Sequence, residues 1–210
     1  MQYLLLLFCY LLGAIPFGLI VGKIAKGIDI REFGSGNIGF TNVLRTLGPG
    51  PGFVVMFLDV AKGFVAVAVC RMLGMNDYMI VTGGILSILG HSFSVFLRFA
   101  GGRSVATSLG VMIGLTPVIA AVAFGIWLVL VALTRIVSVA SMVAAASVPV
   151  MMFFWSSQHA PLPYKIIAIV AAALIIVKHR PNIIRLLNGT ESRLGQRVKL
   201  EHSEGNTENE

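Results

Sequence analysis

The chain has 210 residues, of which 57% are hydrophobic and 12% are charged, and its mean hydropathy is +0.89. Soluble domains carry roughly 25% charged residues, so this composition excludes an ordinary soluble domain. The net charge of +7 does not indicate nucleic-acid binding, because the basic residues are scattered through short segments beside apolar runs, where membrane orientation explains them.

Apolar runs follow one another along most of the chain and predict an all-α, polytopic membrane protein. A helix needs about 20 apolar residues to cross a bilayer, and several runs reach that length. The predicted spans cover residues 2–22, 52–72, 79–97, 105–134, 136–155 and 164–177. No Lys or Arg precedes Lys23, so the first run lacks the basic start of a signal peptide and is expected to remain as a helix.

The two cysteines, Cys9 and Cys70, lie inside apolar runs far apart in the sequence. Their positions suggest two small core residues and neither a disulfide framework nor a metal cluster. No metal or cofactor is expected.

The number of predicted spans depends on whether residues 105–134 cross the membrane once or twice. They contain Pro117 and can form either one kinked helix or two short helices. Two helices give seven spans, with the N-terminus outside and the C-terminus cytoplasmic. Arg71 and Lys165 are then outside, Lys62 is within a span, and every other Lys and Arg is cytoplasmic, which the positive-inside rule favours.

A polar, glycine-rich segment, EFGSGNIGFTNVLRTLG, separates the first two spans at residues 32–48. Gly34, Gly36 and Gly39 match the dinucleotide-binding pattern, and Asp59 follows at about the spacing of its acidic residue. That interpretation is rejected, because no strand precedes the glycines and Asp59 falls inside an apolar helix. Glycines do let backbone N–H groups approach an anion closely, although a solvated connector is the alternative.

Apolar residues recur at helical spacing directly after these glycines. The recurring residues are Phe40, Val43, Leu44 and Leu47. They predict a short amphipathic helix that ends at Gly48-Pro49. Its N-terminus would face the glycine loop, where a helix dipole favours an anion.

A second polar cluster, GHSFSVFLRFAGGRSVATSLG, covers residues 90–110. His91 ends one span and Gly101-Gly102-Arg103 opens the next. A Gly-Gly-Arg turn at a helix N-terminus suits an anion, which Arg103 can bind with two hydrogen bonds. A purely structural histidine is the alternative for His91.

A third cluster, HRPNIIRLLNGTE, covers residues 179–191. His179, Asn182 and Arg185 are spaced by three and would share one face of a helix, with Gly189 as its C-cap. A basic membrane anchor is the alternative for this segment.

Asp59 and Lys62 form an ionisable pair about 10 Å inside the second span, by helix rise. Ionisable residues this deep in a membrane span are costly to bury and therefore indicate a functional role. A structural pair that orients the loop above it is the alternative.

Together these motifs resemble the bacterial acyl-phosphate:glycerol-3-phosphate acyltransferases, integral membrane enzymes that begin phospholipid synthesis. The resemblance rests on residues 34–45, 90–107 and 179–191 and on Asp59-x-x-Lys62-Gly63, and it covers residues 1–195. It implies one transmembrane acyltransferase domain over 1–195, in the cell inner membrane, with its site facing the cytoplasm. Residues 196–210 are expected to form a disordered polar tail.

The resemblance implies transfer of a fatty acyl group from acyl phosphate to the 1-hydroxyl of glycerol 3-phosphate, which gives lysophosphatidic acid. Acyl phosphate has a good leaving group, so no Ser or Cys nucleophile is required. The base would be His179 or an oxygen of a substrate phosphate. Functional coupling to an enzyme that produces acyl phosphate is also expected.

The resemblance also assigns site residues. The catalytic residues would be His179, Ser35 and Asn182. The glycine loop would hold the donor, whereas Arg45, Arg103, His179 and Asn182 would bind or orient the acceptor. The substrate-binding residues implied are Gly34, Gly36, Asn37, Gly39, Thr41, Asn42, Arg45, Asp59, Lys62, His91, Gly101, Gly102, Arg103, Arg185 and Glu191.

The second motif departs from the family pattern. The family usually has Pro at position 94, Lys at 100 and Gly-Gly-Lys-Gly at 101–104, where this chain has Ser94, Ala100, Arg103 and Ser104. Positive charge is kept at 103 and lost at 100. These differences put affinity for the acceptor in question and suggest an altered substrate preference.

Three other functions are less well supported by the sequence. A transporter of a small phosphorylated anion should have polar residues at the bilayer midplane and inverted halves, whereas here the polar clusters share one face. A structural or binding membrane protein has no need for three anion-binding motifs. Acyl-CoA-dependent acyltransferases carry His-x-x-x-x-Asp, and none of the four histidines is followed by Asp at that spacing.

Overall fold

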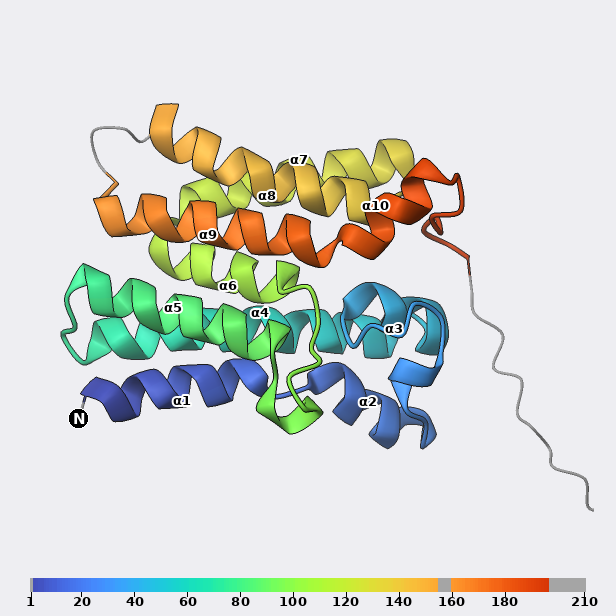
Figure 1. The fold of residues 1–210 in the computed structure, drawn as a ribbon, viewed down its shortest axis with the longest axis horizontal. Helices are drawn as coiled ribbons and strands as arrows, with labels where there is room; N and C mark the ends of the chain where they lie inside the picture. Colours follow the sequence, from blue (N-terminus) through green and yellow to red (C-terminus); the bar gives the residue numbers. More distant parts are fainter. Residues whose placement is uncertain (1, 155–159, 197–210) are drawn as a thin grey trace, which may run out of the picture.

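The computed structural model describes residues 2–154 and 160–196. All regular elements in these residues are helices, and most run along one common axis (Figure 1). Of the predicted polar tail, only Gln196 lies within the described residues.

The first predicted span is broken into two helices, α1 (Gln2–Ala14) and α2 (Phe17–Lys26), with a bend of 41° between them. The break falls at Ile15 and Pro16. Proline has no N–H for the helical ladder and its ring clashes with the preceding turn, which explains why the apolar run does not form one straight helix.

The predicted amphipathic helix is confirmed as α3 (Phe40–Leu47), which ends at Gly48 and follows a short 3₁₀ turn, η1 (Ile30–Glu32). The next two spans are α4 (Pro49–Met72) and α5 (Asp77–Ser92), and a second 3₁₀ turn, η2 (Val95–Leu97), follows.

Residues 105–134 form two helices, α6 (Val105–Leu115) and α7 (Pro117–Thr134), which confirms the two-helix alternative. The break falls at Thr116, directly before Pro117. With 11 residues, α6 is only about 16 Å long, roughly half the thickness of the hydrocarbon core.

The chain ends in α8 (Val137–Phe154), α9 (Leu162–Lys178) and α10 (Arg180–Leu187), with a bend of 52° between the last two. Four helices in the described part of the chain are long and apolar enough to cross a membrane, or up to six if each bent pair is one span. The protein is therefore an all-helical membrane protein, whereas seven spans and the orientation of the termini stay predictions.

Glycines allow α4 and α6 to pack with their backbones in close contact. Gly63 of α4 faces the backbone carbonyl of Thr107, and Gly110 of α6 faces that of Val60, so closely that a Cβ at either glycine would collide with backbone. Cys9 and Cys70 are fully buried free thiols in the central apolar core, as expected for small core residues.

The polar segments gather at one end of the helices. Figure 1 shows α3 and α10 at the same end, whereas the N-terminus and the turn between α4 and α5 lie at the other. The glycine loop, the turn before α6 and α10 thus meet although they are far apart in the sequence.

Candidate functional site

A cavity of about 350 Å³ lies where the three polar segments meet and continues between apolar helices. The lining residues that the sequence predicts are Gly34, Ser35, Asn37, Gly39, Thr41, Asn42, Arg45, Asp59, His91, Arg103, His179, Asn182, Arg185 and Glu191. Four other predicted residues, Gly36, Lys62, Gly101 and Gly102, do not line it. The deeper walls are apolar and come from α6, α7, α8 and α9.

The buried amide of Asn42 holds the glycine loop in place. Its Nδ2 donates to the carbonyl oxygens of Ile30, at 3.1 Å, and Phe33, at 3.0 Å. Its Oδ1 accepts the backbone N–H of Ser35 at 2.9 Å. These bonds engage both ends of the amide, which favours a role in shaping the loop over direct binding of a ligand.

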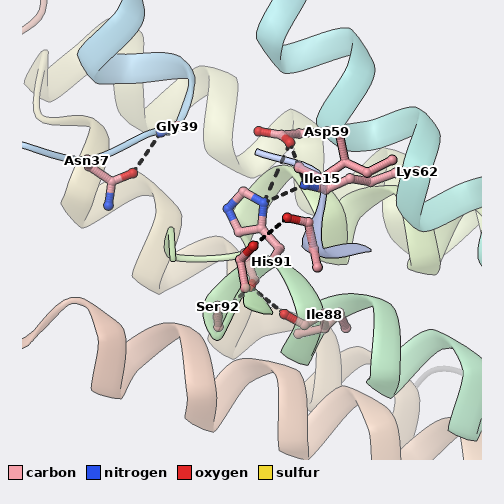
Figure 2. Close-up of polar contacts among 11 residues, drawn as sticks. Ile15, Asn37, Gly39, Asp59, Lys62, Ile88, His91 and Ser92 are labelled. Carbon is pink, nitrogen blue, oxygen red and sulfur yellow. Dashed lines mark hydrogen bonds and ion pairs between the residues drawn. The ribbon is translucent and has the colours of Figure 1, made fainter. Parts of the chain in front are cut away.

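Asn37 makes a second brace in the loop, because its Oδ1 accepts the backbone N–H of Gly39 at 2.8 Å (Figure 2). The N–H groups of Ser35 and Gly39 are therefore bonded within the loop. These two N–H groups are therefore not free for an anion, whereas the sequence pattern predicts only that glycines let loop N–H groups approach one.

Glu191 links the third cluster to α8. Its Oε1 accepts from Ser138 Oγ at 2.7 Å and from Asn182 Nδ2 at 2.6 Å, and its Oε2 accepts from Arg185 Nε at 2.7 Å. Burial raises the pKa of Glu191, but these hydrogen bonds outweigh burial and hold that pKa below its ordinary value. The charged carboxylate of Glu191 therefore accepts hydrogen bonds from Asn182 and Arg185 and holds both side chains in position.

Sequence reasoning missed Ser138, although a signal was present. Ser138 and Ser141 are spaced by three within an apolar helix, so they share one face. Both line the cavity, and Ser141 Oγ also accepts from Trp127 Nε1 at 3.1 Å.

His179 is buried at the junction of α9 and α10 and lines the cavity. Its Nδ1 lies 2.7 Å from the carbonyl oxygen of Ile175. A carbonyl only accepts, so Nδ1 carries the proton and Nε2 is left with a lone pair. The neutral ring therefore has Nε2 as a hydrogen-bond acceptor.

Three guanidinium groups, from Arg45, Arg103 and Arg185, surround the polar end of the cavity. Burial lowers the pKa of Arg45, and burial together with nearby Arg185 lowers that of Arg103 to about 10, so both stay charged at neutral pH. Arg45 Nη2 donates to the carbonyl of Ser192 at 2.8 Å. The buried Arg45 Nε and Asn182 Oδ1 have no hydrogen-bond partner among the described residues, so both are available to a ligand.

Asp59 and Lys62 of α4 form a buried ion pair that contacts α5 and the break between α1 and α2 (Figure 2). Lys62 Nζ lies 2.8 Å from Asp59 Oδ1 and 2.8 Å from His91 Nδ1, and donates to the carbonyl of Ile15 at 3.0 Å. Hydrogen bonds with His91 and Ile15 and the ion pair with Asp59 surround the ammonium of Lys62 with protein partners. These contacts favour the structural alternative for Lys62.

Gly101 and Gly102 press the turn before α6 against the end of α5. Gly102 N–H donates to the carbonyl of His91 at 2.9 Å, and a Cβ at either glycine would collide with His91. Their role is close packing, which places Arg103 on the cavity wall.

Two departures from the family pattern have local hydrogen bonds. Ser94 Oγ donates to the carbonyl of Ala14 at 2.6 Å. Ser104 has a left-handed φ of 59°, and its Oγ donates to the carbonyl of Ile88 at 2.8 Å and lies 2.6 Å from Ser92 Oγ. Figure 2 shows Ser92 and Ile88 beside His91. These bonds offset the strain of a non-glycine residue in this conformation.

Comparisons with known proteins agree with this geometry. The family model described as glycerol-3-phosphate acyltransferase matches residues 3–189. A glycerol-3-phosphate acyltransferase of Synechococcus sp. (strain JA-2-3B'a(2-13)) is 48% identical and covers 90% of this chain and 92% of its own. Glycerol-3-phosphate acyltransferase 2 of Moorella thermoacetica (strain ATCC 39073 / JCM 9320) is 45% identical over 94% of this chain and 100% of its own.

Two solved structures of PlsY (YgiH), an integral membrane glycerol 3-phosphate acyltransferase, are also similar at 42% identity. The glycerol 3-phosphate form has a TM-score of 0.86 and covers 92% of this chain and 96% of its own. The lysophosphatidic acid form has a TM-score of 0.83, with shares of 93% and 96%. The present chain therefore belongs to the glycerol-3-phosphate acyltransferase family.

Proposed function

We propose that this chain transfers a fatty acyl group from acyl phosphate to the 1-hydroxyl of glycerol 3-phosphate and forms lysophosphatidic acid. The observation that carries the proposal is a single cavity with three guanidinium groups and an oriented histidine at its polar end and apolar walls behind them. The polar end suits two phosphate groups, and the apolar walls suit an acyl chain. The two solved structures of PlsY, in glycerol 3-phosphate and lysophosphatidic acid forms, support it.

The reaction needs one proton transfer. The hydroxyl oxygen of glycerol 3-phosphate attacks the acyl carbonyl carbon, the bond from that carbon to the phosphate oxygen breaks, and phosphate leaves. The hydroxyl proton passes to His179 Nε2 or to a phosphate oxygen of a substrate. His179 is suited to the transfer because the carbonyl of Ile175 leaves Nε2 with a lone pair.

The substrates have distinct places in this proposal. The donor phosphate binds beside the glycine loop, at Ser35 and Thr41, and its acyl chain lies between the apolar helices. The acceptor phosphate binds Arg45 and Arg103, and Asn182 Oδ1 accepts from a hydroxyl of glycerol 3-phosphate. Glu191 holds the Asn182 amide in position.

We place the site at the cytoplasmic face of the cell inner membrane. The basic residues of the sequence support this orientation under the positive-inside rule. Acyl phosphate is a reactive anhydride, so coupling to the enzyme that produces it would limit its loss to water.

The donor is tested with purified protein, glycerol 3-phosphate and either palmitoyl phosphate or palmitoyl-CoA, with lysophosphatidic acid measured by mass spectrometry. We expect product from palmitoyl phosphate only. Arg45→Ala should lose most of this activity, whereas Lys26→Ala, an exposed cation on α2, should retain it. Equal turnover with palmitoyl-CoA would overturn the proposed donor.

A further inference from the structure

A second hollow of about 330 Å³ lies beside the site cavity, on the apolar surface formed by α4, α6 and α7. Its lining residues are Met56, Phe57, Val60, Leu109, Ile113, Pro117, Ala120, Ala121 and Phe124. By helix rise these residues lie roughly 6 to 26 Å from the polar end of their helices, within the hydrocarbon depth of a bilayer. The hollow therefore faces lipid, and every residue lining it is apolar.

The hollow and the site cavity share a wall. Five residues line both of them: Met56 and Val60 of α4, Leu109 of α6, and Ala120 and Phe124 of α7. Only this one layer of side chains separates the site from the membrane. Two of its members, Met56 and Phe124, have long side chains, and methionine adapts especially well to different packing.

The short α6 accounts for the position of the hollow. It packs between α4 and α7 and ends at Leu115, after about 16 Å. Ile113 and Pro117, at the end of α6 and the start of α7, form the inner limit of the hollow. A full-length helix at this position would fill the space between α4 and α7.

The two sides of the hollow differ in how firmly they are held. Gly63 and Gly110 bring α4 and α6 into backbone contact. On α7, Gly125 has nothing within 4 Å of the position of a Cβ, and Val118 and Val129 are 64% and 58% exposed. The α4–α6 side is therefore closely packed, whereas the outward face of α7 is open, although its other face buries Ile119, Ala120 and Ala123 in the core.

We propose that this hollow is a lateral portal between α4 and α7, through which the acyl chain passes between the bilayer and the site. The proposal rests on the proposed function, which gives both the donor and the product a fatty acyl chain. A chain that entered from water would expose every methylene to water, which the hydrophobic effect opposes. Sideways passage keeps the chain in apolar surroundings while the phosphate stays at the polar end of the cavity. Phe124 and Met56 form the movable part of the wall.

The test blocks the hollow after the protein has folded. Ala121 is exposed and lines the hollow but not the site cavity, so Ala121→Cys should fold and keep its activity. Benzyl methanethiosulfonate then attaches a bulky group at this thiol, and dithiothreitol removes it. Ala146→Cys on α8 is the matched control, because Ala146 is exposed and lines neither space. The wild type controls for Cys9 and Cys70, which are fully buried.

The measurement is lysophosphatidic acid formation from palmitoyl phosphate and glycerol 3-phosphate before modification, after it, and after reduction. We expect modified Ala121→Cys to lose about tenfold in kcat/KM for palmitoyl phosphate, the effect of excluding about two methylenes from the hollow. The KM for glycerol 3-phosphate should not change, and reduction should restore the rate.

The outcomes separate the portal from the proposed function. Unchanged turnover after complete modification of Ala121→Cys would overturn the portal and leave the acyltransferase intact. An equal loss of activity in modified Ala146→Cys would also overturn the portal, because the loss would then not depend on a group placed in this hollow. Unmodified enzyme that makes no lysophosphatidic acid from palmitoyl phosphate would overturn the proposed function, and the proposed acyl-chain passage with it.

Discussion

At the scale of single residues, the polar end of the cavity divides into side chains that face the ligand space and side chains that hold them. Asn42 and Glu191 are held by the backbone or by other side chains, whereas Arg45 Nε and Asn182 Oδ1 have no partner among the described residues. In the sequence both kinds are simply amide and charged side chains. Only the three-dimensional contacts separate them, because the partners are up to 147 residues apart.

Arg103 is the side chain expected to bind the phosphate of glycerol 3-phosphate. A hydrogen bond to a charged group contributes about 1.5–3 kcal/mol, so Arg103→Ala should lower kcat/KM for glycerol 3-phosphate by about 10- to 150-fold. Arg103→Lys should retain most activity because the charge persists. Steady-state kinetics, with each substrate varied in turn, give kcat/KM for glycerol 3-phosphate in the wild type and in both variants. Arg98→Ala, at an exposed position of the same loop, is the control, and an Arg103→Ala variant that matched it would exclude the role.

Glu191 should make the protein sensitive to acid. Its pKa is lowered in the folded state by hydrogen bonds from Ser138, Asn182 and Arg185. A carboxylate with a lowered pKa contributes stability that is present at neutral pH and is lost as the pH falls below about 5 and protonates it. Thermal unfolding in detergent should therefore show a larger drop with acid in the wild type than in Glu191→Gln. Exposed Glu32→Gln is the control, and identical acid profiles of wild type and Glu191→Gln would contradict the assignment.

At the scale of helices, the sequence predicted the elements better than their contacts. The apolar spacing of residues 40–47 and Pro117, the first residue of α7, are local signals, and they were sufficient to predict α3 and the break between α6 and α7. Pro16 was an equally local signal, yet the apolar composition of residues 2–22 concealed the bend there. The contact of Gly63 with α6 could not be predicted, since a glycine in an apolar run does not show which helix it faces.

Glycines on α6 and α7 should respond oppositely to the same substitution. Gly110→Ala places a Cβ against the carbonyl of Val60 and should destabilise the protein by about 1–3 kcal/mol, as overpacking does. Gly125→Ala meets no neighbour and should be neutral or stabilising by up to about 1 kcal/mol, because alanine favours helix. Unfolding temperatures of the two variants in the same detergent measure the difference. Equal shifts would show that α4 and α6 do not depend on this close approach.

At the scale of the whole molecule, the three polar segments meet at one end of the helices although they are far apart in the chain. This could be predicted from the sequence because charge asymmetry placed all three on one side of a membrane. The shape of the cavity, the acceptor role of Glu191 and the participation of Ser138 depend on tertiary packing. They could not be predicted from composition or spacing.

The predicted topology places that end in the cytoplasm. Exposed Lys26→Cys, at the end of α2, should react with an impermeant maleimide only after cells are made permeable. Leu73→Cys, in the turn after α4 and 52% exposed, should react in intact cells. The wild type should remain unlabelled because both of its cysteines are buried. The reverse pattern would mean the opposite orientation, and labelling of both in intact cells would contradict the seven-span topology.

The most direct test of the central claim is the stoichiometry of one reaction. Purified protein is mixed with palmitoyl phosphate and glycerol 3-phosphate, and released phosphate and lysophosphatidic acid are measured in the same sample. Acyl transfer in the cavity predicts equal amounts of the two products, and no phosphate release above background when glycerol 3-phosphate is omitted. Phosphate released without lysophosphatidic acid would show transfer of the acyl group to water and would contradict the account.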